Sequence, residues 1–145
     1  RIGESRMTPT QITLVQSSFE QVAPIAADAA ALFYERLFQA LPEVKPLFKR
    51  DMDEQGRKLM ATLGTVVRNL DRLEAVLPTA TALATRHVAY GVRPEHYEPV
   101  GAALLWTLQQ GLGKDFTSDT AEAWRAAYGL LSTAMIKAAY SHSAV

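Results

Sequence analysis

The sequence predicts a single all-α domain, and three observations support this fold class. Apolar residues recur at intervals of three and four positions along most of the chain, which is the spacing of one buried helical face. No segment alternates convincingly between apolar and polar residues, and no Asn-Gly or Asp-Gly pair marks a hairpin turn. The chain has 145 residues, of which 48% are hydrophobic, so it is long enough to bury one substantial core.

The first helix is predicted over residues 8–22, "TPTQITLVQSSFEQV". Thr8 is a suitable N-cap, Pro9 suits the first helical position, and Gln11 completes a capping box. The apolar face of this helix consists of Ile12, Val15, Phe19 and Val22.

A second helix should begin at Pro24 and run through residue 41. Its apolar stripe comprises Ala29, Leu32, Phe33, Leu37 and Ala40. Tyr34 and Phe38 border this stripe, so a phenol hydroxyl is expected at the edge of the core. The next stretch, "PEVKPLF", carries two prolines four positions apart, which predicts a short, tight helical corner rather than a long helix.

Residues 49–54, "KRDMDE", are predicted to form a loop that leads into a helix over residues 55–70. The buried side of that helix would contain Leu59, Leu63, Val66, Val67 and Leu70. Pro78 is expected to begin the following helix, which carries His87, and Gly91 is placed to end it.

Two further helices complete the predicted fold. Pro94 should start a long helix, and Thr117 or Ser118 should cap the last one. The inner face of the last helix would consist of Trp124, Tyr128, Leu131 and Met135. We therefore expect about six substantial helices with short connecting ones between them.

The composition excludes several classes of protein. Fifteen basic and fifteen acidic residues cancel without a long run of one sign, so nothing indicates a nucleic-acid surface or a basic membrane helix. The absence of cysteine excludes disulfides and thiolate-held zinc or iron–sulfur centres. The longest uncharged apolar stretch, "VGAALLWTL", is too short to cross a bilayer.

The domain is predicted over residues 8–141, and residues 1–7 are predicted to be an N-terminal extension, either native or left over from cloning. These first residues lack the apolar region of a signal peptide. We therefore expect a cytoplasmic protein.

His87 raises the question of function, because it follows Leu83 by four positions and so falls on the apolar face of its helix. A lone histidine in such a place is most often a hydrogen-bonded core residue. Three features favour a ligand instead. Arg86 adjoins it, no acid or cysteine stands at zinc-site spacing, and two hydrogen-bond donors, Tyr34 and Gln55, lie at the edges of the preceding apolar stripes. A single imidazole in an apolar layer suits an iron macrocycle better than zinc.

Four fragments in order then resemble a known family. "LFYERLF…PEVKPLF", "QGRKLM", "RHVAYGVRPEHYEPVG" and "AWRAAYGLL" are similar to the second helix and corner, the distal helix, the proximal helix with its turn, and the last helix of bacterial globins. The resemblance is to single-domain bacterial globins related to the haem domain of flavohaemoglobins. It covers nearly all of the chain from Met7 to Tyr140.

This resemblance implies a haem pocket with two sides. His87 would be the proximal ligand of the haem iron, and the haem would be of the b type because no cysteine can attach it covalently. Tyr34 and Gln55 would face the open sixth position, and Leu59 would crowd it. Phe48 would pack against the haem at the corner.

Further residues are implied as haem contacts. Lys58 and Arg86 would meet the haem propionates, although both also fit solvated surface charges. Tyr128, on the last helix, would be another contact. The proximal side would be walled by Val92, Tyr97, Val100 and Leu104.

Four residues also have plain structural interpretations. Tyr34 could be a half-buried aromatic residue with its hydroxyl in water. Gln55 could cap a helix, because it stands where a helix is expected to begin. His96 is interpreted as a surface residue at a helix start and His142 as part of a frayed tail.

The sequence departs from the flavohaemoglobin pattern in two places. In that group a late glutamate joins a tyrosine in orienting the proximal histidine. Tyr97 fits the tyrosine, but the matching late position is about Ala139, so His87 should have less imidazolate character. The chain also ends at Val145, which leaves no room for flavin- and nicotinamide-binding domains, so a separate reductase is expected.

Three functions follow as hypotheses. The first is a haem protein that binds dioxygen tightly through Tyr34 and Gln55 and converts nitric oxide to nitrate with a separate reductase. The second is a binding protein for oxygen storage or for sensing dioxygen, nitric oxide or carbon monoxide. The third is a haem-free interaction module, for which His87 and two aligned donors would be unnecessary.

Overall fold

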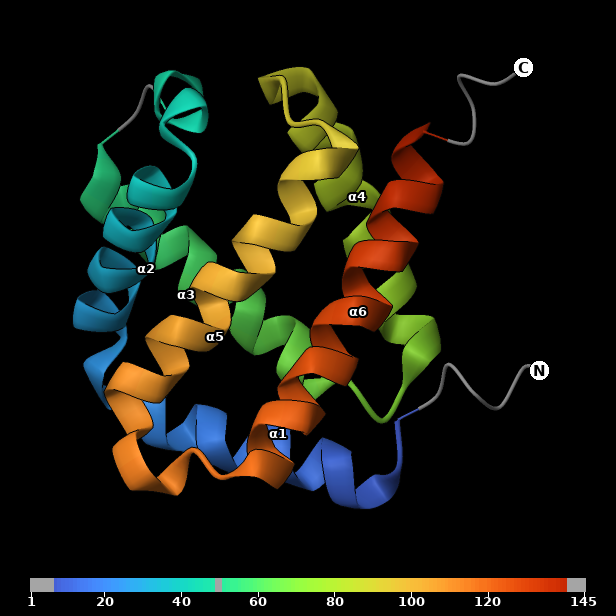
Figure 1. Cartoon of the computed structure of the whole chain (residues 1–145). Coiled ribbons are helices and arrows are strands. Elements are labelled where there is room, and N and C mark those ends of the chain that lie inside the picture. Colours follow the sequence, from blue (N-terminus) through green and yellow to red (C-terminus); the bar gives the residue numbers. More distant parts are fainter. Residues whose placement is uncertain (1–6, 49–50, 141–145) are drawn as a thin grey trace.

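The computed structural model describes residues 7–48 and 51–140 of the chain. Within these residues it contains six α-helices, four short 3-10 helices and no strand (Figure 1). The predicted all-α fold class is thus confirmed. The α-helices are α1 (Pro9–Val22), α2 (Ala26–Ala40), α3 (Met52–Arg68), α4 (Leu73–Tyr90), α5 (Tyr97–Leu112) and α6 (Ser118–Tyr140). The 3-10 helices are η2 (Ala23–Ile25), η3 (Pro42–Leu47), η4 (Pro94–His96) and η5 (Gly113–Asp115).

Several helix ends lie where the sequence predicts them. The hydroxyl of Thr8 accepts a hydrogen bond from the Gln11 amide at 3.1 Å, and the Gln11 side chain accepts one from the Thr8 amide at 3.0 Å. Thr117 caps α6 by accepting from the Thr120 amide at 3.2 Å. These bonds pair amides that have no partner inside the first turn of a helix.

Two predicted helix starts are wrong. The helix α4 begins at Leu73, and Pro78 lies inside it. The proline there removes one backbone hydrogen bond, but Val76 and Ala80 on either side are almost fully buried and hold the helix against its neighbours. The helix α3 begins at Met52, within the predicted loop, because the Asp51 carboxylate accepts from the Asp53 amide at 3.0 Å and caps it.

Smaller differences concern the other boundaries. Pro24 and Pro94 stand in the 3-10 turns η2 and η4, and each turn runs directly into the α-helix predicted to start there. Ala40 is exposed rather than part of the buried stripe of α2. Residues 1–6 of the predicted extension, residues 49–50 of the predicted loop, and residue 141 lie outside the described residues.

The helix α5 occupies the centre of the helical packing. It packs against α2 on one side and α6 on the other, while α1 crosses the end of the molecule and packs mainly on α6 (Figure 1). The helix α3 packs against α2, and α4 packs against α6. The helices α2 and α4 therefore stand on opposite sides of α5.

The largest hydrophobic cluster joins α1, α5 and α6 at the end where α1 crosses. Its buried residues are Val15, Phe19, Val22, Ala29, Val67, Leu108, Leu112, Ala123, Trp124 and Ala127. Trp124 is the largest fully buried side chain, and its indole N–H donates to the Ser18 hydroxyl at 2.8 Å. That hydroxyl in turn donates to the Leu14 carbonyl at 2.7 Å, so this buried polar group is satisfied on both sides.

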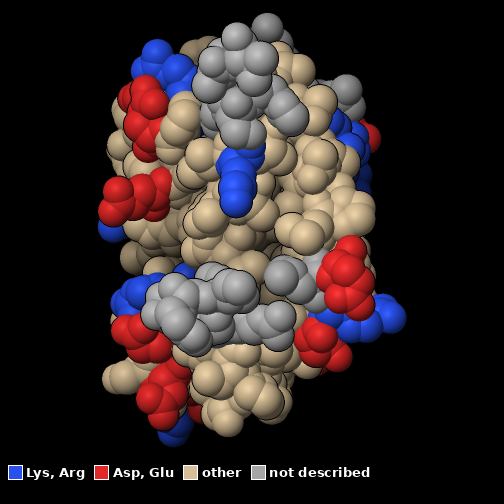
Figure 2. Space-filling view, turned by 90° about the vertical axis from the view of Figure 1, so that its right-hand side faces the viewer, with Lys and Arg blue, Asp and Glu red and all other residues tan. Residues whose placement is uncertain are grey.

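The surface carries charges of both signs. On the face shown in Figure 2, basic and acidic side chains lie along both edges, and one basic side chain stands near the middle. This pattern agrees with the balanced composition and gives no single-sign patch on that face. None of the described helices is both long enough and apolar enough to span a membrane.

Candidate functional site

The first half of the site forms where α2 and α3 cross. Gly56 is buried at the crossing, and a Cβ atom at this position would lie 2.9 Å from the Cβ of Ala30. Such a distance is too short for two carbon atoms, so only glycine allows the two helices to approach this closely. Because Gln55 adjoins Gly56 and Tyr34 lies one turn after Ala30, the crossing brings these two polar side chains together.

Tyr34 is held in place by aromatic neighbours. Its ring centroid lies 5.0 Å from that of Phe33, 6.0 Å from that of Phe38 and 5.3 Å from that of Phe48. These edge-to-face and stacked contacts fix the ring and leave the side chain 7% exposed. Phe48, predicted to pack against the haem at the corner, lies against the Tyr34 ring.

The Gln55 side chain lies close to the Tyr34 hydroxyl. Its side-chain nitrogen lies 3.5 Å from the Tyr34 oxygen, a long hydrogen bond between α2 and α3. Burial raises the pKa of Tyr34, and the bond to Gln55 opposes this only in part. The phenol therefore stays protonated and remains a donor throughout the physiological pH range.

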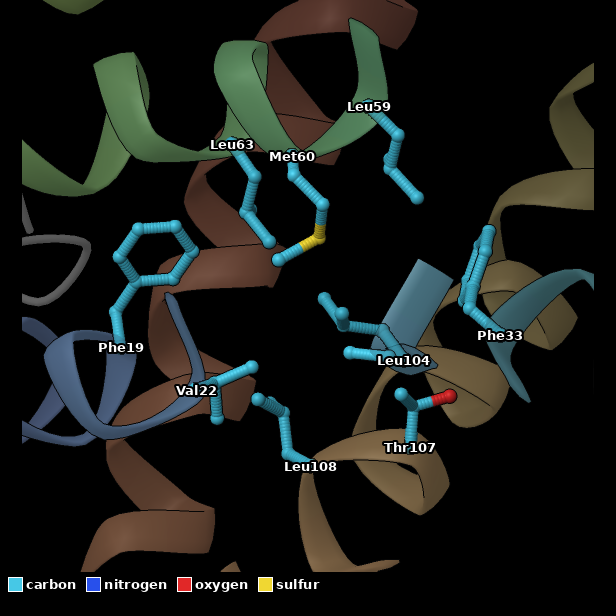
Figure 3. A pocket seen from close by; sticks show the side chains of 10 residues that line it. Phe19, Val22, Phe33, Leu59, Met60, Leu63, Leu104, Thr107 and Leu108 are labelled. Atoms are coloured by element: carbon cyan, nitrogen blue, oxygen red, sulfur yellow. The ribbon is translucent and has the colours of Figure 1, made fainter. Parts of the chain in front are cut away.

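Leu59 lies one turn after Gln55 on α3 and lines an apolar cavity. Figure 3 shows side chains from α1, α2, α3 and α5 pointing into this space, which encloses about 20 Å³. Its lining residues are Phe19, Val22, Ala29, Phe33, Leu59, Met60, Leu63, Leu104, Thr107 and Leu108. The Thr107 hydroxyl donates to the Ala103 carbonyl at 2.9 Å, so the wall offers little to a water molecule.

The second half of the site lies at the end of α4. His87 stands in the last turn, and the helix ends at Gly91, whose φ of 98° belongs to the left-handed region that favours glycine. The amide of Val92 donates to the His87 carbonyl at 3.0 Å, and the amide of Gly91 donates to the Val88 carbonyl at the same distance. The predicted end of this helix is thus confirmed, and the backbone of His87 is fixed by it.

The His87 ring is half-buried and its pKa is lowered. Burial is the main cause, the nearby Arg86 guanidinium adds to it, and a hydrogen bond to the Leu83 backbone opposes both. A neutral imidazole is the form that binds a metal ion, so this environment favours ligation. Leu83 supplies a backbone partner of the kind that fixes the orientation of a ligating ring.

Tyr97, Tyr128 and Ala139 surround the same region. The Tyr128 hydroxyl donates to the Tyr97 carbonyl, which ties α6 to the start of α5. Burial raises the pKa of Tyr128, and the neighbouring Tyr97 adds to this. Ala139 packs against the cluster that contains Tyr97 and Met135, so the position expected to carry a relay glutamate does lie near this cluster and offers no carboxylate.

The hydrophobic core around the site consists of two separate clusters, and this arrangement fits a flat apolar group. One cluster gathers around Tyr34 from α2, η3 and α5, and another gathers around Tyr97 from α4 and α6. The aliphatic and aromatic side chains implied as haem contacts are only half-buried: Phe48, Leu59, Val92, Val100 and Leu104. Haem would complete their burial, which contributes roughly 25 cal/mol for each Å² of apolar surface removed from water.

The donor set also fits haem. In the described part of the chain no group of three or more histidine, cysteine or acidic side chains could hold a bare metal ion. A single imidazole is instead what an iron macrocycle needs, because the macrocycle supplies the other ligands. His87 would hold the iron, and Arg86, which is exposed next to it, could meet a propionate.

Two of the remaining sequence interpretations have a definite outcome. Lys58 is about half exposed and lies 4.0 Å from Glu54, so its charge already has a partner on α3. His96 is 5% exposed, and its interpretation as a surface residue is wrong because its ring folds back to accept a backbone hydrogen bond. His142 lies outside the described residues.

Sequence reasoning missed two features of the site. The role of Gly56 depends on the crossing of α2 and α3, which the sequence does not show. The signal in the sequence was a small residue, Gly56, together with the alanines of α2. The cavity of Figure 3 is built from four helices, and no local pattern marks it.

The comparisons with known proteins agree with this geometry. The model of the Globin family matches residues 31–135. The flavohemoprotein of Halalkalibacterium halodurans is 34% identical over 108 residues, which are 72% of this chain and 26% of that protein. The flavohemoprotein of Chromobacterium violaceum is 36% identical over 107 residues, again 72% of this chain and 26% of the relative. That of Vibrio cholerae is 29% identical over 133 residues, 90% of this chain and 34% of the relative.

The helical packing and the matched family model together define a haem-binding globin. The chain belongs to the globin family and is related to the globin part of flavohemoproteins. It spans about a quarter to a third of the length of these relatives. The family binds haem and small gases, which agrees with the single imidazole and the apolar walls described above.

The α2–α3 crossing gives a first prediction. Gly56→Ala should push the two helices apart, because the added methyl group would meet a Cβ atom that cannot rotate away. We expect a loss of about 1–3 kcal/mol in the free energy of unfolding, the usual cost of overpacking. Urea unfolding of the haem-free protein measures it.

Gly129→Ala is the matched control. A Cβ at this helical position meets nothing within 4 Å, so alanine should leave stability unchanged or raise it by up to about 1 kcal/mol. Equal stability of the Gly56→Ala variant and the parent would show that the crossing does not depend on glycine.

Proposed function

We propose that this chain binds haem b through His87, binds dioxygen tightly beneath Tyr34 and Gln55, and oxidises nitric oxide to nitrate. The observation that supports this most directly is the approach of the Gln55 amide to the Tyr34 hydroxyl, 3.5 Å apart, at the edge of an aromatic cluster. Two donors from different helices are brought to one place, and the neighbouring side chains are apolar. Such a pocket stabilises a small ligand that carries partial negative charge.

The haem iron, when bound, would supply the position at which dioxygen binds and becomes reactive toward nitric oxide. The Tyr34 hydroxyl would donate a hydrogen bond to a gas bound there. The ring is fixed by three aromatic neighbours, so little conformational freedom is lost when the hydroxyl is used. The raised pKa keeps the proton on the phenol oxygen.

Gln55 would be the second donor and would also orient the Tyr34 hydroxyl. It lies in the first turn of α3 and is half-buried, so it is held less firmly than Tyr34. Leu59 and the apolar cavity behind it would keep water away from the ligand. A dry, donor-lined pocket slows ligand release, and slow release favours chemistry on the bound gas over transport.

Turnover would also require electrons. The residues matched to the globin family account for most of the helical core, so we propose that a reductase outside these helices restores the ferrous state. The flavohemoprotein relatives, as their name states, combine a flavin with a haem protein. A protein of that kind, or another flavin-dependent reductase, is the expected electron source.

One observation favours an alternative function, reversible oxygen storage or gas sensing. Burial lowers the pKa of His87, and the Arg86 guanidinium lowers it further. The late position near Tyr97 is occupied by Ala139 rather than by an acid. Ala139 supplies no carboxylate that could increase the electron donation of an imidazole ligand. A less donating ligand favours binding of the gas over its chemical activation.

Nitrate formation separates these two functions. Mixing the oxygenated protein with one equivalent of nitric oxide should yield close to one equivalent of nitrate, and turnover should continue once a flavin reductase and a nicotinamide cofactor are supplied. Ion chromatography measures the product. Release of dioxygen without nitrate would favour the storage or sensing function.

The axial ligand gives a further prediction. His87→Ala should lose most of its haem, or keep it without the spectrum of a histidine-ligated ferrous iron, because no other described imidazole is placed to replace it. Extraction into pyridine should identify the wild-type haem as type b. An unchanged five-coordinate histidine spectrum in the variant would contradict the assignment of His87.

The distal donors give the last prediction of the proposed function. Tyr34→Phe keeps the ring packed among its aromatic neighbours and removes only the hydroxyl. Loss of one hydrogen bond to a charged acceptor costs about 1.5–3 kcal/mol, so oxygen dissociation should become roughly ten- to a hundredfold faster. Gln55→Leu should have a smaller effect, since this side chain is less firmly held. Stopped-flow measurement of oxygen release compares both variants with the parent.

An oxygen dissociation rate in Tyr34→Phe that equals the parent's would rule out the phenol as the main donor. A larger effect of Gln55→Leu than of Tyr34→Phe would assign the main role to the amide instead.

A further inference from the structure

His96 is a buried titratable residue that the proposed function does not use. It lies in the turn between α4 and α5 and is 5% exposed, although its neighbours Arg93 and Glu95 form an exposed ion pair with a nitrogen–oxygen distance of 3.0 Å. Two charged side chains of this turn thus point to solvent while the imidazole points inward. Burial of a polar ring is unfavourable unless it is hydrogen-bonded.

The hydrogen bond of this ring is directed to the backbone. The amide of Arg93 donates to Nδ1 of His96 at 3.1 Å. A ring nitrogen that accepts carries no proton, so in this arrangement the ring N–H is Nε2. Arg93 is the N-cap of η4 and His96 stands three positions later, so the imidazole takes the place that glutamate or glutamine fills in a capping box.

This hydrogen bond is one of several that fix the backbone between His87 and Tyr97. The Val92 amide is bound to the His87 carbonyl, and the amide of the next residue, Arg93, is bound to His96. The amide of Tyr97 donates to the carbonyl of Pro94, and the Tyr97 carbonyl accepts from Tyr128. The His96 side chain thus bonds the backbone inside the turn at Arg93.

Val92 and Tyr97, the residues on either side of this turn, belong to the hydrophobic cluster at the end of α4. They share this cluster with Ala84 and Leu83, and the backbone of Leu83 is bonded to the His87 ring. A turn that loosened at Arg93 would let both residues shift relative to that ring. The orientation of a ligating imidazole depends on such neighbours, which are not themselves ligands.

We propose that His96 is a positioning residue for the proximal side of the pocket, which holds Val92 and Tyr97 against His87 by accepting the Arg93 amide hydrogen. The proposal rests on the proposed haem ligation by His87. It goes beyond it because it assigns the geometry of the proximal side to a side chain that is neither the proposed ligand nor a proposed distal donor.

Resonance Raman spectroscopy of the ferrous holoprotein tests this role through the iron–histidine stretching band. His96→Leu removes the acceptor and should shift or split this band. His96→Gln keeps an acceptor at the same capping position and should restore the parent band. Hydrogen exchange, followed by NMR on the same variants, should show about tenfold lower protection of the Arg93 amide in His96→Leu and near-parent protection in His96→Gln.

Gln16→Leu is the matched control. It also removes one side-chain bond to the backbone, from the Gln16 amide to the Val67 carbonyl at 3.0 Å, but at the opposite end of the core. It should lower stability without moving the iron–histidine band. If His96→Leu loses stability in the same way and leaves the band in place, His96 is only a structural cap and the proposal is overturned.

Failure of the proposed haem ligation would be recognised separately. Absence of an iron–histidine band in the parent protein would contradict His87 as ligand. Hydrogen exchange would then decide the positioning role. Lost protection at Val92 and Arg93 in His96→Leu, with recovery in His96→Gln, supports it, and unchanged protection in both variants overturns it.

Discussion

The packing of α5 between α2 and α6 is the constraint on which the rest of this molecule depends. One end of α5 supplies Tyr97 to the proximal cluster, and the next turns supply Val100, Ala103 and Leu104 to the distal cluster. Because one rigid helix contributes to both, the distance between the distal and proximal sides is set by packing and not by loops. The two sides of the pocket could not keep their spacing if either face of α5 were repacked.

The distal side shows how apolar packing gives polar groups a direction. Close approach of α2 and α3 at Gly56 brings Gln55 within reach of Tyr34, and the aromatic rings around Tyr34 fix its hydroxyl. Burial raises the pKa of the phenol and so keeps its proton available. Donors that are fixed in advance need no reorganisation when a charged ligand arrives, which is why a few such groups can dominate its affinity.

The proximal side is built mainly from backbone hydrogen bonds. The end of α4, the turn that follows and the start of α5 are each fixed by amide donors, one of them accepted by His96. The imidazole of His87 is kept neutral by burial and by Arg86, and no acid occupies the position of Ala139. Under the proposed function the two sides would act in different ways: one would supply a neutral ligand of fixed orientation, and the other would supply donors to the bound gas.

The sequence by itself determined the fold class, the helix faces and the identity of the candidate site residues. These depend on local spacing and on residue type, so His87, Tyr34 and the end of α4 at Gly91 could be located without coordinates. Only the tertiary structure decided where α4 begins, how closely α2 and α3 approach, and that His96 is buried. The physical reason is that a proline or a histidine is energetically acceptable in several local settings, and the packing of distant helices selects among them.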